Sequence, residues 1–590
     1  MKSGSFIKFY ITAFLLLGFC LAEAQSDRYL VLFTDSLEII EKYPISQDSN
    51  KFIITEISFN RKPTWASYSR TAKPQLSKLA TDRREKLHIK LESSDYFVMP
   101  GFMDSLSKYP IHIIRPSRWL NGVLVVISDT DVLNKISKLE FVKSALFLGK
   151  LPDDYTPASF DPGNIQTKTE ESSDFQRAYF DKEHINPRIQ GFAYEQLKMI
   201  FDSLVDETPY QKVDFPIAVI DAGFRNVNLI PCFKHLFRNN LIQGTYDFSS
   251  NDSMVFDDDD HGTKVLSCLA GYDQGNFSGS APNSKFWLLR SEETASETLA
   301  EEVLWCLAAE YADSVGCGLI TSSLGYNYFD NTEHNHSYEE MDGEHTIIAK
   351  AIKIAASKGI TVISSSGNEG DKTWHYITTP GDSKYALTLG ACNKKGEYAY
   401  FSSIGPSSDG RTKPDVVTLG YETVVCSPMG NYTQANGSSF STPLMAGFVA
   451  HLKQDFPLIA DSILFDAIRF SSSQASQPNN KMGYGIPNYM AAKKLLSFYQ
   501  SSDYTGIIWS ISKTNNDFEI RKLNDGKTVR VLLKSGTKIL NQFDVQNSFH
   551  LFNTYKLTFS KRLKKGKKYT LEFIDENKKT LLVSNLIVHQ

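Results

Sequence analysis

The chain has 590 residues, of which 41% are hydrophobic and 22% charged, and its formal net charge at pH 7 is −4. This length exceeds one ordinary domain, and the composition is that of a globular protein rather than a disordered or fibrous one. Nucleic-acid binding is disfavoured, because the most basic run, Lys561–Lys568, contains no interleaved aromatic residues. We therefore expect a globular protein of three or four domains.

The N-terminus has the pattern of a secretory signal peptide. Lys2 precedes an apolar stretch over Phe6–Leu21, and Ala22-Glu23-Ala24 follows it. The apolar stretch is shorter than the roughly 20 residues that span a bilayer, so a retained anchor is the weaker alternative. The sequence predicts a signal peptide over residues 1–24 and no transmembrane segment after it.

The next segment alternates strand and helix patterns. Strands are expected over Arg28–Thr34, Gly122–Ser128 and Phe141–Leu148, and Asp129 is placed to cap a helix between the last two. An Arg- and Lys-rich stretch, Trp65–Leu91, has the pattern of an inserted helical element. Residues 25–150 are thus predicted to form a compact α+β domain, and the polar residues 151–190 a linker.

Three segments far apart in the chain carry side chains suited to nucleophilic catalysis. Phe215–Ile220 is a short apolar run typical of a buried parallel strand, and it ends in Asp221. His261 precedes a helical segment, and Ser439 lies just before the apolar-periodic segment Leu444–Leu452. A serine hydroxyl needs a base to take its proton, and the base is commonly oriented by a third group. An Asp-His-Ser triad is therefore expected.

The local sequences around these residues resemble those of the subtilisin-like serine peptidases (subtilases). They are Asp221-Ala222-Gly223, His261-Gly262-Thr263 and Gly437-Ser438-Ser439-Phe440-Ser441-Thr442-Pro443. The resemblance covers roughly residues 214–496, and it implies the triad roles that are described for subtilisin itself. Ala222 replaces a hydroxyl residue of the family pattern and Ser438 replaces a threonine, but neither change removes a proton-transfer group.

Two further segments match the family and imply more site residues. Ser365–Gly370 resembles the oxyanion-hole segment, in which Asn368 would donate a side-chain N–H to the developing oxyanion. Leu319–Tyr326 resembles the substrate-binding strand, which an extended peptide can join by strand addition. Glu369 falls at the mouth of the specificity pocket, where it would give a mild preference for basic side chains. The implied substrate-binding residues are Ser323, Leu324, Gly325 and Gly367.

The fold class expected is α/β, with a three-layer subtilisin-like core and a mostly parallel sheet covered by helices on both faces. Strands are predicted at Phe215, Lys285–Leu289, Leu319, Ile360, Ala386–Ala391 and Tyr421–Cys426. Helices are predicted near Leu299–Ala312, His345–Ser357 and Leu444–Gln454. This peptidase domain would occupy residues 191–498.

Residues 499–590 alternate apolar and polar residues between turn signals, which predicts a small C-terminal β-sandwich. Its ending loosely resembles the sorting domains of the bacterial type IX secretion route, although the usual Asn-Pro start is absent. If the tail is a sorting signal, the protein is expected to be secreted or at the surface of a bacterium; otherwise it would be periplasmic.

Catalysis by this triad requires no cofactor, but the family often binds structural calcium. Asp257–Asp260 and the acidic insertion Asp330–Asp342 could hold a cation, and a solvated loop is the alternative for both. The six cysteines after the signal are widely spaced and include no CxxC pair. Disulfides and buried free thiols both remain open.

The leading hypothesis is a secreted serine endopeptidase made as a self-inhibited precursor, with peptides or proteins as substrates. Its own N-terminal domain would act as inhibitory propeptide; an ordinary domain that stays attached is the alternative. A binding module on the same scaffold would not require the four catalytic groups. A nucleotide-dependent enzyme is disfavoured, because no GxGxxG loop accompanies Asp221.

Overall fold

The computed structural model describes residues 27–33, 74–150 except 75, 97–99 and 128, 191–500, and seven strands between 508 and 587. The predicted signal peptide and linker lie outside the described residues. Across the described part of the chain, the helices are too short or too polar to cross a bilayer.

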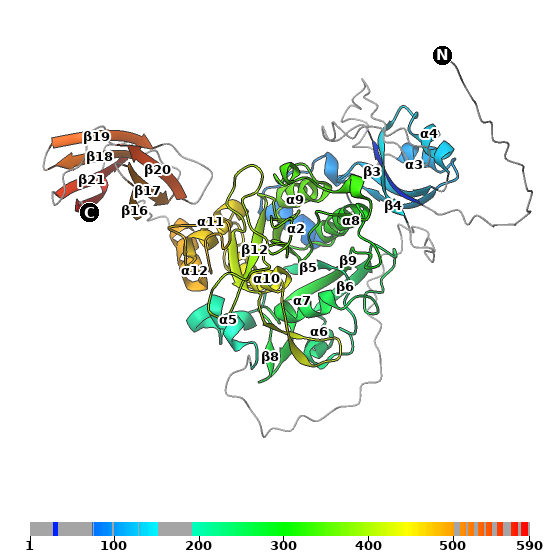
Figure 1. Cartoon of the computed structure of the whole chain (residues 1–590), viewed down its shortest axis with the longest axis horizontal. Helices are drawn as coiled ribbons and strands as arrows, with labels where there is room; N and C mark the ends of the chain where they lie inside the picture. Colours follow the sequence, from blue (N-terminus) through cyan, green and yellow to red (C-terminus); the bar gives the residue numbers. More distant parts are fainter. Residues whose placement is uncertain are drawn as a thin grey trace, which may run out of the picture.

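The core is built on a seven-stranded sheet whose neighbouring strands are all parallel (Figure 1). Five of the strands are buried along their whole length, as expected for apolar runs that are covered on both faces. In spatial order the strands are β13 (Val416–Leu419), β12 (Ala386–Cys392), β11 (Thr361–Ser365), β10 (Leu319–Ser322), β5 (Pro216–Asp221), β9 (Lys285–Arg290) and β6 (Ile242–Asp247).

Helices cover both faces of this sheet, which confirms the predicted three-layer α/β core. One apolar cluster contains residues of α7 (His261–Ala270) and α10 (Ser438–Asp455), and a second contains residues of α8 (Ala300–Val315) and α9 (Ile347–Ser357). Figure 1 shows the two pairs on opposite sides of the strands. Further helices are α5 (Tyr194–Phe201), α6 (Lys234–Arg238), α11 (Asp461–Ser471) and α12 (Tyr489–Gln500).

One strand assignment is wrong. The run at Tyr421–Cys426 forms β14 (Thr423–Cys426), which pairs antiparallel with β15 (Tyr432–Ala435) in a separate hairpin and not with the parallel sheet. A short apolar run has the same pattern in either setting, so periodicity could not separate them. The sheet ends instead at β13 on one edge and at β6 on the other.

The N-terminal domain is a four-stranded sheet in the order β2-β3-β1-β4 with helices beside it. The strands are β1 (Asp27–Phe33), β2 (His112–Ser117), β3 (Gly122–Ile127) and β4 (Val142–Lys150), and the helices are α2 (Lys78–Lys86), α3 (Pro100–Leu106) and α4 (Thr130–Ile136). Asp129 caps α4 by accepting from the Asp131 N–H at 2.8 Å, as predicted. The strand β2 had not been foreseen.

This domain contacts the core first through the end of β2 and the turn after it. The buried Glu310 carboxylate of α8 accepts from Ser117 Oγ at 2.8 Å and from the Arg118 N–H at 3.0 Å, and it forms an ion pair with Arg118 Nε at 2.8 Å. The Glu310 carboxylate of the core thereby binds both the backbone and the guanidinium group of Arg118 in the N-terminal domain.

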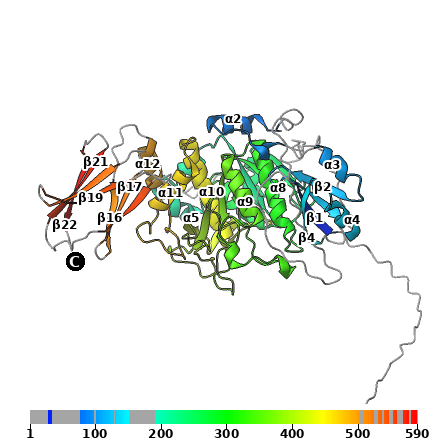
Figure 2. The ribbon, with the colours of Figure 1, turned by 90° about the horizontal axis from the view of Figure 1, so that it is seen from above.

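A second contact lies at α2, which Figure 2 shows over the core and away from α3 and α4. Arg84 forms 2.6 Å ion pairs with Asp95 of its own segment and with Asp313 of α8. Lys358, fully buried at the end of α9, lies 3.2 Å from the same Asp95. Residues 77–96 are thus a docking arm that is fixed to the core by buried charges.

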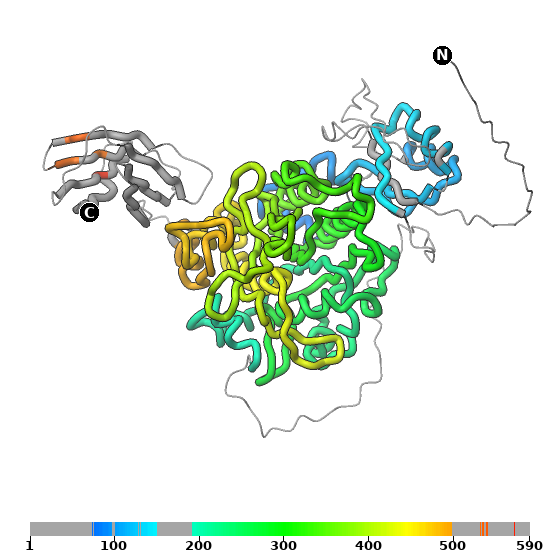
Figure 3. The backbone as a smooth tube through the Cα atoms, in the orientation of Figure 1, coloured from blue at the N-terminus to red at the C-terminus, as the bar shows by residue number. Residues whose placement is uncertain are grey.

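The C-terminal strands pair antiparallel in two sheets of order β16-β17-β20 and β19-β18-β21-β22. Their packing as a β-sandwich and their use as a sorting domain stay predictions. Figure 3 traces the backbone of the core beside that of the N-terminal domain. The strands are β16 (Ile508–Thr514), β17 (Asp517–Leu523), β18 (Val529–Ser535), β19 (Lys538–Val545), β20 (Phe552–Thr558), β21 (Lys568–Asp575) and β22 (Thr580–Ile587).

All six cysteines in the described residues are buried free thiols. The sequence left both disulfides and buried free thiols open, and the structure has buried free thiols at these six positions.

Candidate active site

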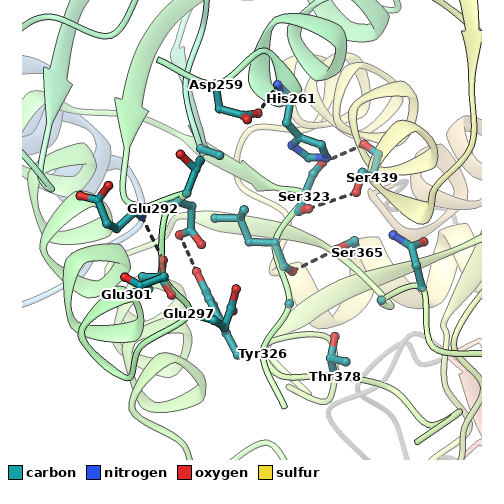
Figure 4. A pocket seen from close by; sticks show the side chains of 18 of the residues that line it. Asp259, His261, Glu292, Glu297, Glu301, Ser323, Tyr326, Ser365, Thr378 and Ser439 are labelled. Atoms are coloured by element: carbon teal, nitrogen blue, oxygen red, sulfur yellow. Dashed lines mark hydrogen bonds between the residues drawn. The ribbon is translucent and has the colours of Figure 1, made fainter. Parts of the chain in front are cut away.

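The candidate site lies at the carboxyl edge of the parallel sheet, where β5, β10 and β11 end. A pocket of about 590 Å³ opens there (Figure 4). Because the strands are parallel, residues that follow them meet at one edge although they are far apart in sequence. The pocket is lined by seven of the eight residues predicted for the site, His261, Ser323, Leu324, Gly325, Gly367, Asn368 and Ser439, and the eighth, Asp221, lies buried behind His261.

Asp221 and His261 are held in direct contact. Asp221 Oδ1 lies 2.6 Å from His261 Nδ1, and the His261 N–H donates to Asp259 Oδ1 at 2.7 Å, which fixes the start of α7. Burial opposes the charged imidazolium, but the Asp221 carboxylate outweighs it, so the pKa of His261 is raised above its ordinary value. The pair is therefore arranged as a base with its orienting carboxylate.

Ser439 lies in the first turn of α10, which begins six residues before the predicted apolar segment. Pro443 has no N–H to give to the Ser439 carbonyl four residues earlier, and the Ser323 hydroxyl donates to that carbonyl instead, at 2.8 Å. The substrate-strand segment thus supplies the hydrogen bond that proline removes from the helix. This contact ties the nucleophile's turn to the end of β10.

The Ser439 hydroxyl donates to the Ser323 carbonyl at 3.2 Å. The described contacts include no hydrogen bond from Ser439 Oγ to His261, although both side chains line the same pocket. Catalytic hydrogen bonds are often long or misaligned before substrate binds, and rotation about one side-chain bond redirects a serine hydroxyl. The structure thus brings Asp221, His261 and Ser439 to one site. The Ser439 hydroxyl is hydrogen-bonded there to Ser323 and not to His261.

Asn368 is oriented by the residue before the nucleophile. Its Oδ1 accepts from the Ser438 N–H at 2.9 Å, and Ser438 Oγ lies 3.1 Å from this oxygen and 3.0 Å from the Gly367 carbonyl oxygen. With Oδ1 occupied, the Asn368 amide nitrogen is left for the cleft. Ser438 keeps the hydroxyl that the family's threonine would provide. Its role in orienting Asn368 was not predicted from the sequence.

The other departure from the family pattern, Ala222, leaves one oxygen of Asp221 without a hydrogen-bond partner in the described residues. The Ala222 N–H donates to Asp221 Oδ1 at 2.8 Å, so this oxygen serves both Ala222 and His261. Asp221 Oδ2 is buried and has no hydrogen-bond partner among the described residues. The hydroxyl that Ala222 lacks is the type of group that would satisfy it.

The predicted specificity pocket is bounded by two glycines. A Cβ on Gly325 would lie 2.3 Å from Thr378 Oγ1, and a Cβ on Gly367 would lie 2.7 Å from the same atom. Gly367 also has a φ of +97°, which disfavours any side chain. Glu369 lines the pocket as expected, but it forms a 2.8 Å ion pair with Lys372, so its charge is largely offset.

The acidic segments that could bind calcium have other contacts. Asp259 accepts from the His261 N–H, Asp260 pairs with Lys264 at 2.7 Å, and Asp258 lies 3.5 Å from Arg290. In the described residues, no three His, Cys, Asp or Glu side chains form a group that could hold a metal ion. Structural calcium stays an untested expectation.

Sequence reasoning missed a group of carboxylates at the far end of the pocket. The group comes from the loop after β9, the start of α8 and the loop after β10, and it surrounds the buried Tyr326 (Figure 4). The doublet Glu292-Glu293, separated by two residues from the end of the predicted strand Lys285–Leu289, was the one local signal. Its members are Glu292, Glu297, Glu301 and Asp330.

A parallel α/β core with Asp, His and Ser side chains at the carboxyl edge of its sheet defines the class of serine hydrolases. Residues 212–485 match the family model described as "Subtilase family", and residues 55–159 match the "Peptidase S8 propeptide domain, Bacteroidota". The chain therefore contains a subtilase-family domain and a propeptide domain, as the resemblance predicted.

Several bacterial serine proteases are similar to this chain. The cell wall-associated protease of Bacillus subtilis is 24% identical over 55% of this chain and 34% of its own length. The thermophilic serine proteinase of Bacillus sp. strain AK1 is 28% identical over 45% and 58%. The chain thus spans between a third and three fifths of these relatives. The solved epidermin leader peptide processing serine protease of Staphylococcus aureus is 16% identical with a TM-score of 0.49, over 69% of this chain and 98% of that one.

Proposed function

We propose that the protein is a serine endopeptidase that hydrolyses peptide bonds through an acyl-enzyme. Ser439 Oγ attacks the carbonyl carbon of the substrate, and His261 takes its proton and returns it to the leaving amine. Asp221 orients the imidazole and stabilises its charged form. Water then enters, His261 activates it by the same proton transfer, and the acyl group is released from Ser439.

The oxyanion of each tetrahedral intermediate is held by two donors in this proposal. One is the side-chain amide of Asn368. The other is the Ser439 backbone N–H, which has no hydrogen-bond partner among the described residues because it lies in the first turn of α10. The fixed amide orientation of Asn368 supports the first assignment, since Ser438 occupies its oxygen. No cofactor takes part.

The single observation that carries the proposal is the 2.6 Å contact between Asp221 and His261 in the pocket that Ser439 lines. An Asp-His pair at this distance sets the imidazole tautomer that a serine needs from its base. A scaffold used only for binding would have no use for the contact, for the oriented Asn368, or for a pKa of His261 raised by Asp221.

The protein is proposed to be made as a secreted, self-inhibited precursor. The N-terminal domain is its own inhibitor in this proposal, and the docking of Arg118 on Glu310 and of Arg84 on Asp313 supports a stable complex with the core. The bond that frees the site is expected within residues 151–190. The signal pattern over residues 1–24 supports export.

The test follows mass and peptide hydrolysis over time for protein without residues 1–24, beside a Ser439→Ala variant. The wild type should shed a piece that ends within residues 151–190 and then cleave peptides, while the variant stays whole and inert. If the wild type is trimmed by a second protease and still neither cleaves peptide nor reacts with a serine-directed phosphonate, the scaffold serves binding and the proposal fails.

A further inference from the structure

The pocket is strongly acidic, and the acidity is uneven along its length. Lys372 is the one Lys or Arg among the described lining residues, and it pairs with Glu369 beside the predicted specificity pocket. Arg290 lies 3.8 Å from Glu293. Asp259 lies beside His261 and accepts a hydrogen bond from its backbone N–H. Four other lining carboxylates lie at the opposite end of the pocket, and none of the four has a Lys or Arg partner within ion-pair distance in the described part of the chain: Glu292, Glu297, Glu301 and Asp330.

Glu292 is the clearest case of a carboxylate at this end of the pocket that has no Lys or Arg beside it in the described residues. Its side chain is only 8% exposed, and its Oε1 accepts from Tyr326 at 2.6 Å and from Ser291 at 2.8 Å. Its second oxygen, Oε2, has no hydrogen-bond partner in the described residues. Burial, together with the charges of Glu297 and Asp221, raises the pKa of Glu292 to about 7. A nearby cation would relieve this cost.

Glu301 closes the end of the pocket behind Glu292. Its two oxygens accept from the backbone N–H groups of Glu293 and Thr298, at 2.9 and 3.0 Å, so its carboxyl group is fixed in place. Burial and the charges of Glu292 and Glu297 raise the pKa of Glu301 to about 10. In Figure 4 Glu292, Glu297 and Glu301 lie together, across the pocket from His261 and Ser439.

The geometry favours a cation that is carried by the substrate over a bound metal ion. The described residues contain no group of three carboxylates close enough to share one metal ion. A lysine or arginine side chain can instead extend along the pocket and meet carboxylates one after another. Leu324 and Gly325 line the pocket and connect Ser323, which contacts Ser439, to Tyr326, which contacts Glu292. A peptide paired with this backbone therefore reaches both ends.

We propose that Glu292, Glu297 and Asp330 form an acidic subsite that binds a lysine or arginine side chain of the substrate, on the same side of the scissile bond as the residue in the Gly325–Gly367 pocket. The inference rests on the proposed peptidase function and names its substrate class: peptides with a basic residue before the cleaved bond. Glu301 supports the subsite from behind and does not contact the substrate.

The test uses internally quenched peptides of one sequence that carry lysine, norleucine or glutamate at each of the four positions before the scissile bond. At one position the wild type should cleave the lysine peptide about tenfold faster in kcat/KM than the norleucine peptide, and the glutamate peptide slowest. The Glu292→Gln/Glu297→Gln variant should reduce the lysine-to-norleucine ratio to near one. Glu339→Gln, which removes an exposed charge outside the pocket, should leave the ratio unchanged.

Two additions keep the test decisive. Glu297→Gln alone changes a carboxyl group that accepts no hydrogen bond in the described residues, so it should fold even if the buried Glu292→Gln does not. Binding of the same peptide sequences, each with a single fluorophore, to a Ser439→Ala variant trimmed by a second protease should show the lysine preference in fluorescence polarisation without turnover.

Three results would overturn the inference in distinguishable ways. Cleavage of all peptides with no lysine preference, or a preference that survives in the double variant, rejects the acidic subsite and leaves the peptidase standing. If calcium stabilises the wild type but not the double variant, and lysine peptides are not preferred, the carboxylates bind a metal ion and the acidic subsite is rejected. Failure to cleave any peptide after trimming rejects the peptidase and the subsite together.

Discussion

Removing the Ser438 hydroxyl tests whether this residue acts on catalysis through Asn368. Ser438 Oγ lies 3.1 Å from Asn368 Oδ1, and the Ser438 N–H independently holds the same oxygen at 2.9 Å. Ser438→Ala therefore removes one of two contacts that orient the amide. A net hydrogen bond contributes about 0.5–1.5 kcal/mol, so we expect kcat to fall by about two- to thirteenfold.

The loss should appear in kcat with KM nearly unchanged, because the oxyanion exists only in the transition state. Removing the donor itself, in Asn368→Ala, should cost about 2.7–4 kcal/mol of barrier. Ser438→Thr keeps the hydroxyl and should retain most of the activity. Active-site titration with a phosphonate and thermal unfolding would separate a catalytic effect from misfolding.

The double variant decides whether the reasoning is right. Once Asn368 is alanine, the Ser438 hydroxyl has no amide to orient, so Ser438→Ala should cause little further loss in the Asn368→Ala background. If the two losses multiply, Ser438 affects catalysis by another route. If Ser438→Ala alone leaves kcat unchanged, its backbone N–H is sufficient to hold Asn368.

Three other perturbations test contacts elsewhere in the molecule. Asp221→Asn removes the charge that raises the pKa of His261, so the acid limb of the kcat/KM profile should move to lower pH while kcat falls by about 10⁴-fold. The buried Asp415 forms ion pairs with Lys413 at 2.9 Å and with Arg469 at 2.7 Å. Asp415→Asn leaves these two cations without their carboxylate, so it should lower the free energy of unfolding by about 3–5 kcal/mol in urea at pH 7. Because the native pKa of Asp415 is about 2, below its unfolded value, this difference should persist above pH 4 and shrink as pH falls towards 2. Arg84→Ala should speed amide exchange in the docking arm at least tenfold, whereas Lys86→Ala should not.

The catalytic elements could be predicted because each depends on a local pattern. A buried apolar run that ends in Asp221 is a parallel strand in almost any α/β core, and His261 and Ser439 begin helices whose apolar spacing is plain. Parallel pairing then brings these positions to one edge without further information.

Features that depend on distant partners were missed. β6 contains Gly244 and polar residues at an edge of the sheet, so it lacks the apolar run of a buried strand. The acidic subsite is assembled from Glu292 and Asp330, which lie in different loops. No periodicity relates such residues. Their significance appears only in the structure, where the buried Glu292 has no Lys or Arg within ion-pair distance in the part of the chain that is described.

The helix α8 links the docking of the N-terminal domain to the site. Its last turns carry Glu310 and Asp313 and no basic residue, and negative charge near a helix C-terminus is unfavourable. Arg84 and Arg118 of the N-terminal domain neutralise these two carboxylates. The N-terminal domain therefore stabilises α8. In the core alone, the charges of Glu310 and Asp313 near the C-terminus of this helix would be unfavourable.

The opposite end of α8 begins at Ala300, next to Glu301 at the back of the pocket. One helix of 16 residues thus carries the docking carboxylates at one end and a wall of the acidic subsite at the other. Because α8 also packs on β5 and β9, its placement fixes the edge from which Asp221 and the loop after β9 emerge. A domain that sets this helix while the chain folds would also set the pocket. In the proposed precursor, the pocket would then keep its shape after that domain is cleaved off.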